Sequence, residues 1–476
     1  MGRQLGVRDP RTGRVDHTLT CADAEDVRAA AARARAAQPA WQALGAQGRA
    51  DALRALRDAV AAGAETMVAA LVADTGRLPV SRLEVDSVVA SLGRWCDRAP
   101  ALLAADLLTA DAAVPTSMPG IALRQDPLPY PLVGAISPWN FPLLLAMIDA
   151  VPALLAGSAV LLKPSEITPR FADVLRDRVA TVPELDGVFT VIDGDGTTGA
   201  AVVDTVDLVC FTGSVRTGRA VGAAAAARFI PAFLELGGKD PAIVRADADL
   251  DRAAQAILYG GTVNTGHSCM SIERVYVAEP VHDEFVDLLV ARARKVGLAY
   301  PDVADGDLGP IISAAQIAII ADQLADAVAR GAAVRCGGEI RELGGGVYLE
   351  PTVLTGVDHG MKVMREETFG PVLPVMPFAD DDEAVALAND SEFGLSAAVF
   401  ASTTEAALAV GARLEAGGIS VNDASLSGFV QDGEKNAFKS SGLGGSRMGA
   451  ASIRRFQRQR SFLIRSPDDR APWWFS

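Results

Sequence analysis

Short apolar runs alternate with helical segments over residues 133–235, and this alternation constrains the fold more than any other feature of the sequence. Strands that alternate with helices are typical of a parallel sheet with helices on both faces. A second series of the same kind follows from about residue 242, so an α/β fold is predicted. The strands expected in the first series are residues 133–137, 159–163, 189–192, 208–212 and 230–235, and the helices between them are residues 143–155, 168–180, 198–204 and 218–226.

The 476 residues of the chain are too many for one simple core, so two or three domains are expected. Helical spacing predicts helices in residues 21–73 and 83–108. Residues 116–133 are expected to be extended, because prolines at 115, 119, 127, 129 and 131 exclude a continuous helix.

One apolar segment, residues 143–162, is long enough to span a membrane. It contains Asp149, which is costly in lipid, and Pro152 and Gly157, which fit a helix followed by a turn and a strand. The segment is therefore interpreted as a buried α/β element, and no membrane association is expected. The first nine residues lack an apolar stretch, so no secretory signal is expected either.

Charge and cysteine content disfavour several classes of protein. The formal net charge of −15 would repel a phosphate backbone, so no nucleic-acid partner is expected. The five cysteines are scattered without a CxxC pair, and the four histidines lack metal-ligand spacing. These patterns predict a reduced, cytoplasmic protein without a metal site.

Three side chains could carry chemistry. Cys269 lies in the small-residue turn of residues 264–269, where a thiol can be an exposed nucleophile, although most free cysteines are simply small buried side chains. Glu235 ends an apolar strand before two glycines, where a carboxylate can be a general base or only a local cap. Asn140 follows a strand and could donate to an oxyanion, or it could be an ordinary turn residue.

Two glycine-rich loops compete as the phosphate-binding site. Residues 194–199 match GxGxxG between a strand and a helix, but Asp195 inside this loop would repel phosphate. Residues 213–218 also join a strand to a helix, with GxxxxG spacing, and Arg216 would attract phosphate. Motif matching favours the first loop and electrostatics favours the second.

Taken together and in order, these segments resemble the aldehyde dehydrogenase family. The resemblance extends from about residue 20 to about residue 465, and the candidate glutamate and cysteine are separated by 34 residues (269 − 235). The matching segments are PWNFP at 138–142, KPSE at 163–166, FTGS with a later glycine at 211–218, ELGGK at 235–239, the Gly-x-x-Cys turn at 266–269, EETFGP at 366–371, SVND at 420–423 and FKSSGLG at 438–444.

The resemblance implies an enzyme that oxidises an aldehyde to a carboxylic acid. Cys269 would attack the carbonyl to form a thiohemiacetal, and Asn140 with the Cys269 backbone N–H would hold the oxyanion. Loss of hydride would leave a thioester, and Glu235 would activate the water that hydrolyses it.

The fold implied by the resemblance has three parts. They are a nucleotide-binding Rossmann-like domain at 1–108 and 131–237, an α/β catalytic domain at 238–455, and a β oligomerisation arm at 109–130 and 456–476. Exposed strand edges of such an arm should pair across subunits, so a homodimer or homotetramer is expected.

The resemblance also implies a nicotinamide dinucleotide site. Lys163 and Glu166, at the end of a predicted strand, would bind the adenosine ribose, and Glu366 would bind the nicotinamide ribose. The loop at 213–218 would bind the pyrophosphate, and the loop at 194–199 would lie near the adenosine. Glu166 would repel a 2′-phosphate, so NAD is expected rather than NADP. The cofactor residues expected are Ser137, Trp139, Lys163, Ser165, Glu166, Gly196, Phe211, Gly213, Ser214, Gly218, Leu236, Gly237, Glu366 and Phe369.

Two departures from the family pattern bear on the site. His267 stands where the family often has glutamine. Asp149 stands where many members have lysine or arginine, on the helix that lines the substrate tunnel in the family. An acidic group there would disfavour carboxylate-bearing aldehydes such as succinate semialdehyde, so a neutral aliphatic or aromatic aldehyde is the expected substrate.

Two other functions stay open. One is a CoA-acylating dehydrogenase, which is disfavoured because those relatives usually lack the glutamate at position 235. The other is a catalytically idle binding protein on the same fold, which is disfavoured by the complete set of Cys269, Glu235 and Asn140.

Overall fold

The first of two large sheets is formed by the segment that was predicted to alternate between strands and helices. The computed structural model describes residues 2–107 and 113–465. The predicted elements of this segment are confirmed, apart from shifts of a few residues at their ends. The strands are β5 (Leu132–Ile136), β6 (Ala159–Lys163), β7 (Phe189–Val191), β8 (Leu208–Thr212), β9 (Ala232–Glu235) and β21 (Gly442–Leu443). The connecting helices are α5 (Pro142–Ala156), α6 (Phe171–Val179), η1 (Pro183–Leu185), α7 (Gly196–Val203) and α8 (Val215–Ala227).

The strand order of this sheet provides a place for a nucleotide. The order is β21-β9-β8-β5-β6-β7, in which β21 is antiparallel to β9 and all the other pairs are parallel. From β5 the chain adds β6 and β7 on one side, and it then returns to add β8 and β9 on the other. Parallel α/β sheets bind nucleotides at such a reversal, beyond the C-terminal ends of the strands. Residues 137–141 and 213–214 follow β5 and β8 at this position.

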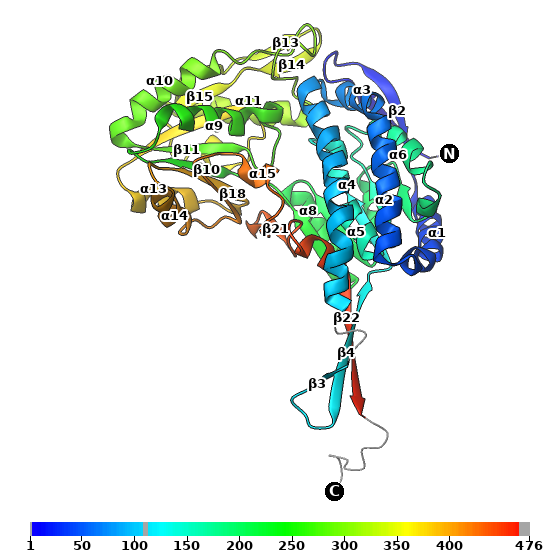
Figure 1. Cartoon of the computed structure of the whole chain (residues 1–476). Helices are drawn as coiled ribbons and strands as arrows, with labels where there is room; N and C mark the ends of the chain where they lie inside the picture. The colour runs from blue at the N-terminus through cyan, green and yellow to red at the C-terminus, as the bar shows by residue number, and fades with distance from the viewer. Residues whose placement is uncertain (1, 108–112, 466–476) are drawn as a thin grey trace.

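Four N-terminal helices pack around this sheet, on the right of Figure 1. Buried side chains such as Trp41, Leu53 and Leu92 join them to its core, so the predicted N-terminal helices are confirmed. A hairpin of β1 (Gln4–Arg8) and β2 (Val15–Thr20) was not predicted, because most of its side chains lie at the surface and show no apolar pattern. The helices are α1 (Ala24–Ala43), α2 (Gly45–Ala62), α3 (Ala64–Thr75) and α4 (Leu78–Leu107).

The second large sheet lies on the left of Figure 1. Its strands are β10 (Asp240–Val244), β11 (Ile272–Ala278), β12 (Ala333–Cys336), β15 (Thr352–Thr355), β16 (Val372–Phe378), β18 (Ser396–Phe400) and β19 (Gly418–Val421). The order is β12-β15-β16-β11-β10-β18-β19, and only the β12–β15 pair is antiparallel. This mostly parallel sheet confirms the second α/β series.

The second sheet is surrounded by helices and short β pairs. The helices are α9 (Leu250–Thr262), η2 (Val263–Gly266), η3 (Glu279–Val281), α10 (His282–Ala293), α11 (Ala314–Ala329), α12 (Lys362–Arg365), α13 (Asp381–Asn389), α14 (Thr404–Gly411) and α15 (Leu426–Phe429). The short pairs are β13 (Ile340–Leu343) with β14 (Gly346–Leu349), and β17 (Phe393–Gly394) with β20 (Phe438–Lys439).

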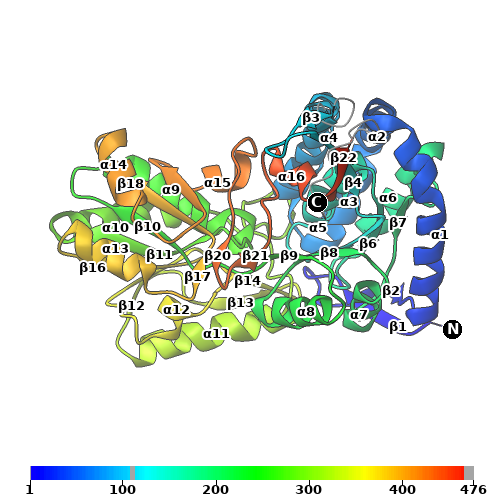
Figure 2. The ribbon, with the colours of Figure 1, turned by 90° about the horizontal axis from the view of Figure 1, so that it is seen from below.

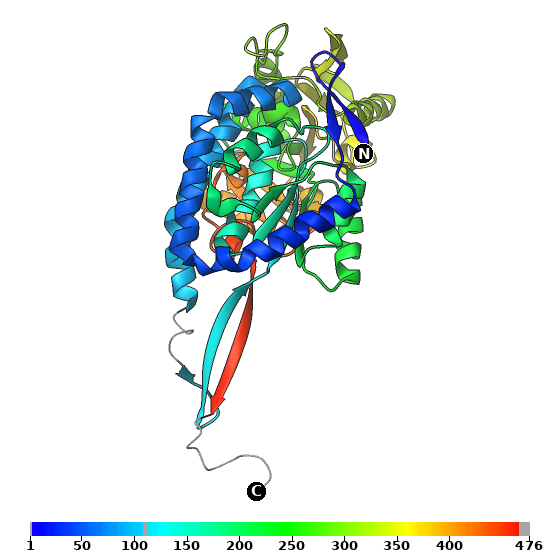
Figure 3. The same cartoon turned by 90° about the vertical axis from the view of Figure 1, so that its right-hand side faces the viewer.

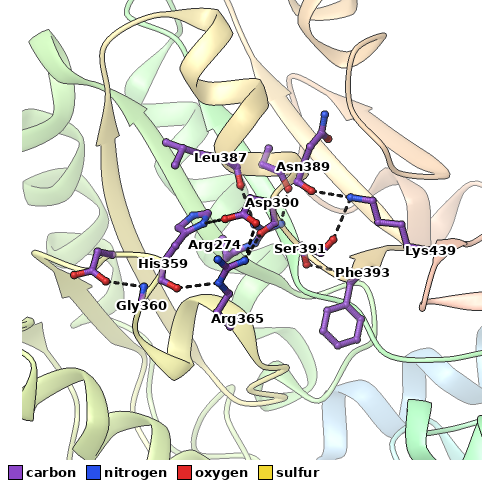
Figure 4. Close-up of polar contacts among 12 residues, drawn as sticks. Arg274, His359, Gly360, Arg365, Leu387, Asn389, Asp390, Ser391, Phe393 and Lys439 are labelled. Carbon is purple, nitrogen blue, oxygen red and sulfur yellow. Dashed lines mark hydrogen bonds and ion pairs between the residues drawn. The ribbon is translucent and has the colours of Figure 1, made fainter.

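A polar network at the C-terminal end of α13 joins several elements of this half (Figure 4). Arg274 of β11 donates to Leu387 O and Ala388 O at 3.1 and 2.8 Å, and Lys439 of β20 donates to Asn389 O at 2.7 Å. Cations at a helix C-terminus satisfy its free carbonyl groups and its dipole. Just beyond the helix, Asp390 accepts from Arg365 of α12 at 2.7 Å. The network therefore links the end of α13 and Asp390 to β11, α12 and β20.

A β arm projects from the body (Figure 3). It contains β3 (Val114–Pro115), β4 (Ile121–Pro129) and β22 (Gln457–Arg465), and β4 pairs with β22 along its whole length, from Ile121 opposite Arg465 to Pro129 opposite Gln457. This pairing agrees with the expected arm, although parts of the predicted arm, at 109–112 and 466–476, lie outside the described residues.

The segment after residue 441 returns to the first sheet instead of staying with the second. β21 pairs with β9, and β20 and β21 lie between the two halves (Figure 2). The helix α16 (Ala451–Arg454) packs on α5, and Ile453 and Phe456 are buried in the first core. The expected catalytic domain at 238–455 therefore extends too far. The short apolar contacts that return the chain to the first sheet have no local sequence pattern from which this boundary could be predicted. Apart from this correction, the division into domains stays a prediction.

The apolar segment at 143–162 is a helix, a turn and a strand. α5 ends at Ala156, Gly157 adopts a φ of 107°, and β6 follows within the sheet. A left-handed glycine after a helix is a common helix stop. In the described parts of the chain, no helix combines the length and the apolar character needed to cross a membrane.

Candidate active site

Cys269 follows a left-handed turn between α9 and β11. Asn264, Thr265 and Gly266 have φ values of 56°, 58° and 70°, which are unfavourable for residues other than glycine. A Cβ at Gly266 would lie 2.3 Å from the carbonyl carbon of Gly370, so only glycine fits there. The structure thus keeps a strained backbone directly before the candidate nucleophile.

Arg77, just before α4, holds this turn. Its buried guanidinium donates to Asn264 Oδ1 and to Pro310 O, and it lies 2.9 Å from His267 Nδ1. The same Nδ1 lies 3.1 Å from Asn264 O, so it faces a guanidinium, which can only donate, and a carbonyl, which can only accept. Burial and then the Arg77 charge lower the pKa of His267 well below its usual value. The sequence analysis missed Arg77, because a single arginine before a helix carries no distinctive signal.

Asn140 is fixed by the same turn. Its Nδ2 donates to His267 O at 3.0 Å, while Asn264 Nδ2 donates to Asn140 O at 2.8 Å and to His267 O at 2.9 Å. The His267 ring packs against Trp139 and Phe369, with ring centroids 5.2 and 5.7 Å apart. His267, whose role the sequence left open, therefore connects the oxyanion candidate to two aromatic residues of the cofactor prediction.

Cys269 lies where two cavities meet. The smaller cavity has a volume of about 110 Å³ and also contacts Asn140, Ser214 and Phe369. The larger cavity has a volume of about 400 Å³ and also contacts Glu235. A side chain shared by two cavities can react with a group in one while a second ligand occupies the other. Cys269 and Asn140, predicted to act together, are thus in one site.

The ELGG segment brings Cys269 and Glu367 close to the end of β9, which carries Glu235. Glu235 ends β9, and its side chain is 16% exposed. A Cβ at Gly238 would lie 2.2 Å from Cys269 O, and a Cβ at Gly237 would lie 2.7 Å from the Glu367 carboxylate. The two glycines are therefore required for the close approach of Cys269 and Glu367 to the end of β9.

The Cys269 thiol is in an environment that disfavours the thiolate. Burial, followed by the nearby charges of Glu235, Glu367 and Asp240, raises its pKa to about 12, while Arg447 acts in the opposite direction. The thiol is therefore protonated at neutral pH. A reaction at this sulfur needs a group that removes the proton, because the thiolate is the nucleophile.

The predicted cofactor residues border the reversal of the first sheet. Ser137 lies just past β5, and in the described part of the chain its buried Oγ has no hydrogen-bond partner. Lys163 ends β6 and is buried, with Nζ 2.9 Å from Pro164 O and 3.3 Å from Glu166 Oε2. Ser165 Oγ accepts from the Ile167 N–H. An unpaired hydroxyl beside a lysine and a carboxylate fits a ligand that carries phosphate and hydroxyl groups.

The two glycine-rich loops differ at the helix N-termini. In the first loop, the Asp195 carboxylate accepts from the N–H groups of Thr197 and Thr198 at 2.8 and 3.4 Å, so it already caps α7, which begins at Gly196. In the second, Ser214 caps α8, and no acidic residue lies in the first turn of that helix. A helix N-terminus without a bound carboxylate attracts phosphate. This difference favours the loop at 213–218.

The second loop packs tightly against the end of β9. A Cβ at Gly218 would lie 2.4 Å from the Leu236 side chain, and a Cβ at Gly213 would lie 2.6 Å from the Phe211 ring. Both glycines therefore serve close packing, and Gly213, Ser214, Leu236 and Gly237 line the smaller cavity.

A comparison with known families decides the identity. The model of the aldehyde dehydrogenase family matches residues 2–462 of this chain. The chain belongs to the aldehyde dehydrogenase family. It has the aldehyde dehydrogenase fold and is an oxidoreductase that acts on aldehydes.

Individual relatives agree with this assignment. A structure from Anabaena variabilis that carries the name of an aldehyde dehydrogenase is 54% identical, covers 100% of both chains and has a TM-score of 0.96. A betaine aldehyde dehydrogenase from Staphylococcus aureus, solved with NAD⁺, is 30% identical with a TM-score of 0.92, covering 100% of this chain and 94% of the other.

Two sequence relatives differ in their named substrates. A 4,4′-diapolycopene aldehyde oxidase from Methylomonas is 39% identical over 82% of this chain and 73% of its own length. A Mycolicibacterium smegmatis protein that carries the name of an NADP-dependent succinate-semialdehyde dehydrogenase is 37% identical over 94% of this chain and 86% of its own.

One predicted cofactor residue of this aldehyde dehydrogenase is not in the site. Glu366 is exposed and lines neither of the cavities at Cys269, whereas its neighbour Glu367 lines the smaller one. Two adjacent carboxylates cannot be distinguished from the sequence, because the local backbone direction decides which of them faces the cavity. Burial raises the pKa of Glu367 to about 8.

A buried ion pair sets that backbone direction. Lys239 of the ELGGK segment contacts Glu273 Oε2 at 2.8 Å. Glu273 also accepts from the N–H groups of Thr368 and Phe369, both at 2.7 Å. Phe369 has a φ of 49°, which this anchor helps to maintain. The lysine of the motif thus positions the loop that carries Glu367 and Phe369.

The expectation for Asp149 is wrong. The side chain does not line the larger cavity of this aldehyde dehydrogenase, and it is buried between Arg447 and Arg455. Arg447 donates to Asp149 Oδ2 at 2.7 Å. Two guanidinium groups compensate the carboxylate, so it cannot repel a substrate carboxylate as predicted. Helix position alone did not show which side of α5 faces the cavity.

Proposed function

We propose that this enzyme oxidises a neutral, largely apolar aldehyde to the carboxylic acid with NAD, through a covalent thioester on Cys269. The observation that carries the proposal is the position of Cys269 between two cavities, with Asn140 on one and Glu235 on the other. The larger cavity would hold the aldehyde. The smaller, which continues toward the reversal of the first sheet, would hold the reactive end of the cofactor.

Cys269 begins the reaction by attack on the aldehyde carbon, which forms a C–S bond and a tetrahedral oxyanion. Its proton must leave first, and Glu235 is a carboxylate on the same cavity that can accept it. The second N–H of Asn140 Nδ2 and the Cys269 backbone N–H are the donors for the oxyanion. One such donor contributes on the order of 10² to 10³ in rate.

A bound nicotinamide cofactor supplies the acceptor for the hydride that leaves the tetrahedral carbon. The thioester that remains on Cys269 is then hydrolysed. Glu235 first releases the thiol proton to solvent and then takes a proton from water. The resulting hydroxide attacks the carbonyl carbon, the C–S bond breaks, and the sulfur regains a proton from Glu235. The presence of Glu235 favours hydrolysis over transfer of the acyl group to CoA.

The residues that would hold the cofactor are those at the reversal of the first sheet. Ser137, Ser165 and Lys163 offer polar atoms, and the N-terminus of α8 at Ser214 would face the pyrophosphate. Glu367, in place of the predicted Glu366, would bind the nicotinamide ribose beside Phe369. The carboxylate of Glu166 supports NAD, because it would repel the 2′-phosphate of NADP.

The lining of the larger cavity supports an apolar substrate. Eleven of its 25 lining residues are apolar, and the Glu84 carboxylate is already occupied by the N–H groups of Leu143 and Leu144. A terminal nitrogen of Arg447 pairs with Asp149, so the charge of this arginine is already partly compensated. The apolar members are Leu83, Ala90, Phe141, Leu144, Leu145, Ile148, Val263, Met270, Ala424, Phe429 and Met448.

A panel of aldehydes with NAD, followed by the absorbance of NADH, tests the proposal. Neutral aldehydes such as benzaldehyde should be oxidised at least tenfold more efficiently than succinate semialdehyde, and equal efficiency would reject the substrate class. The addition of CoA should leave the rate unchanged. A rate that depends on CoA would instead support the acylating function.

Two variants separate the chemical steps. Cys269→Ser should form no NADH, whereas Cys336→Ser, a change at a thiol outside both cavities, should behave like the parent enzyme. Glu235→Gln should form NADH more slowly and stop after about one equivalent per site, because the thiol loses its proton acceptor and the thioester is no longer hydrolysed. NADH formation by the Cys269→Ser enzyme would show that the thiol is not the nucleophile.

A further inference from the structure

Arg447 carries a buried N–H group without an acceptor. Its side chain is 8% exposed, and a terminal nitrogen donates to Asp149 Oδ2 and Thr212 Oγ1, both at 2.7 Å. Within residues 2–107 and 113–465, nothing accepts a hydrogen bond from its Nε. Buried donors without a partner are rare because their desolvation is costly. The Nε–H is therefore free to serve another group at the site.

The carboxylate of Glu235 lies near this nitrogen. Arg447 Nε lies 3.8 Å from Glu235 Oε1, and both side chains line the cavity that Cys269 shares. This separation is too long for a hydrogen bond but short enough for a strong charge interaction. Asp149 and Thr212 hold the other end of the guanidinium, so Arg447 is fixed in this direction.

A third cavity lies behind Glu235, and a second cation borders it. The cavity has a volume of about 10 Å³, close to the space that one water molecule needs, and it contacts Glu235, Met270, Lys435 and Arg447. Lys435 is partly buried, and its Nζ donates to Ser427 O at 2.5 Å and lies 3.3 Å from Met270 Sδ. A carboxylate, a lysine and an arginine thus meet around one small space.

The Glu235 carboxylate lies among other titratable side chains. Two cations face it, Arg447 and Lys435, together with the thiols of Cys269 and Cys210. Asp149 lies behind Arg447, but Arg455 pairs with its second oxygen. Asp149 therefore does not cancel the effect of Arg447 on Glu235.

We propose that Arg447 is a positioning residue for Glu235: its free Nε–H orients the carboxylate for proton transfer from the hydrolytic water, and Lys435 is a second cation at the same small cavity. This inference rests on the proposed function. In the step concerned, water gives a proton to Glu235 and its oxygen to the thioester carbon, the C–S bond breaks, and the carboxylic acid leaves. Arg447 and Lys435 exchange no proton in this step.

The test follows hydrolysis of the acyl-enzyme as a function of pH. p-Nitrophenyl acetate acylates Cys269 directly with release of p-nitrophenolate, so steady-state turnover then reports hydrolysis without hydride transfer. The acidic limb of kcat is the part of its pH profile in which kcat falls toward low pH. In Arg447→Gln this limb should move to higher pH by about 1 to 3 units, which is the range for loss of an opposite charge at this distance. Lys435→Met should move it in the same direction. Arg447→Lys, which keeps the charge, should stay closer to the parent enzyme.

The double variant Asp149→Asn with Arg447→Gln separates positioning from simple charge compensation. Neutralising both partners should restore the Tm lost in Arg447→Gln, while the acidic limb of kcat stays shifted. A double variant with the limb of the parent enzyme would overturn the proposal, because Arg447 would then only compensate Asp149. If the parent enzyme shows no turnover that depends on Cys269, the proposed function itself fails, and this result is distinct from an unshifted limb.

Discussion

At the scale of single residues, the main feature is that the proposed nucleophile, Cys269, is protonated at neutral pH. The raised pKa of Cys269 follows from its burial and from three nearby carboxylates, Glu235, Glu367 and Asp240. The reactivity of Cys269 should therefore depend strongly on pH.

We predict that inactivation by iodoacetamide, without cofactor, becomes about tenfold faster per pH unit between pH 6 and pH 9. The pKa of about 12 means that the thiolate fraction rises through this whole range. The measurement is the loss of NADH formation with time at each pH. A plateau near pH 7 would contradict the raised pKa, and the Cys336→Ser variant controls for a second reactive thiol.

A second prediction at this scale concerns the cofactor. Glu166→Gln should improve kcat/KM with NADP relative to NAD by about tenfold, the factor that corresponds to about 1.4 kcal/mol. The change removes a carboxylate that repels the 2′-phosphate and releases Lys163, which lies 3.3 Å from it. Steady-state kinetics with both cofactors measure the ratio. Glu184→Gln, at an exposed position, should leave it unchanged, and an unchanged ratio in Glu166→Gln would show that this side chain does not select the cofactor.

At the scale of elements, α5 begins on a buried carboxylate. Glu84 of α4 accepts from the N–H groups of Leu143 and Leu144 in the first turn of α5, directly after the PWNF segment. Burial raises the pKa of Glu84 to about 8. Since the unfolded value is about 4.3, this group contributes stability that is complete below that pH and is lost as pH rises through 8.

We predict that the Tm of the enzyme falls between pH 6 and pH 9, and that it falls less in Glu84→Gln. The amide keeps an acceptor for the two N–H groups but cannot ionise. Thermal unfolding followed by circular dichroism at several pH values measures the difference. Glu405→Gln, an exposed change on α14, should follow the parent curve. A Glu84→Gln curve parallel to the parent curve would contradict the raised pKa of Glu84.

At the scale of the whole molecule, the arm presents a strand edge that pairs with no other strand within the described residues. β22 lies at the outside of the sheet β22-β4-β3, and Leu463 on it is 74% exposed. An unpaired edge with exposed apolar side chains is a surface for another chain. We propose that it pairs across subunits in a homodimer or homotetramer.

Light scattering should therefore give the mass of a dimer or a tetramer, and Leu463→Asp should shift the distribution toward smaller species. The added carboxylate would be buried without a partner in the interface. Leu408→Asp, which is also exposed but lies on α14 outside the arm, is the matched control and should leave the mass unchanged. A monomeric parent enzyme would contradict the proposal.

The sequence by itself determined the alternating elements, the parallel sheets and the segments that hold Cys269, Glu235 and Asn140. These features depend on local periodicity and on the order of short motifs, which are present in the chain before it folds. Even the apolar segment at 143–162 could be placed inside the protein, because Asp149, Pro152 and Gly157 are part of the local pattern.

Only the tertiary structure decided how side chains are directed and which charges meet. Glu367 faces the cavity and Glu366 does not, because Glu273 accepts hydrogen bonds from the N–H groups of the next two residues, Thr368 and Phe369. Glu273 lies 95 residues before Thr368 in the sequence. Asp149 is compensated by Arg447, which is 298 residues away in the sequence. Such pairings depend on the packing of distant segments, and no local pattern in the chain encodes them.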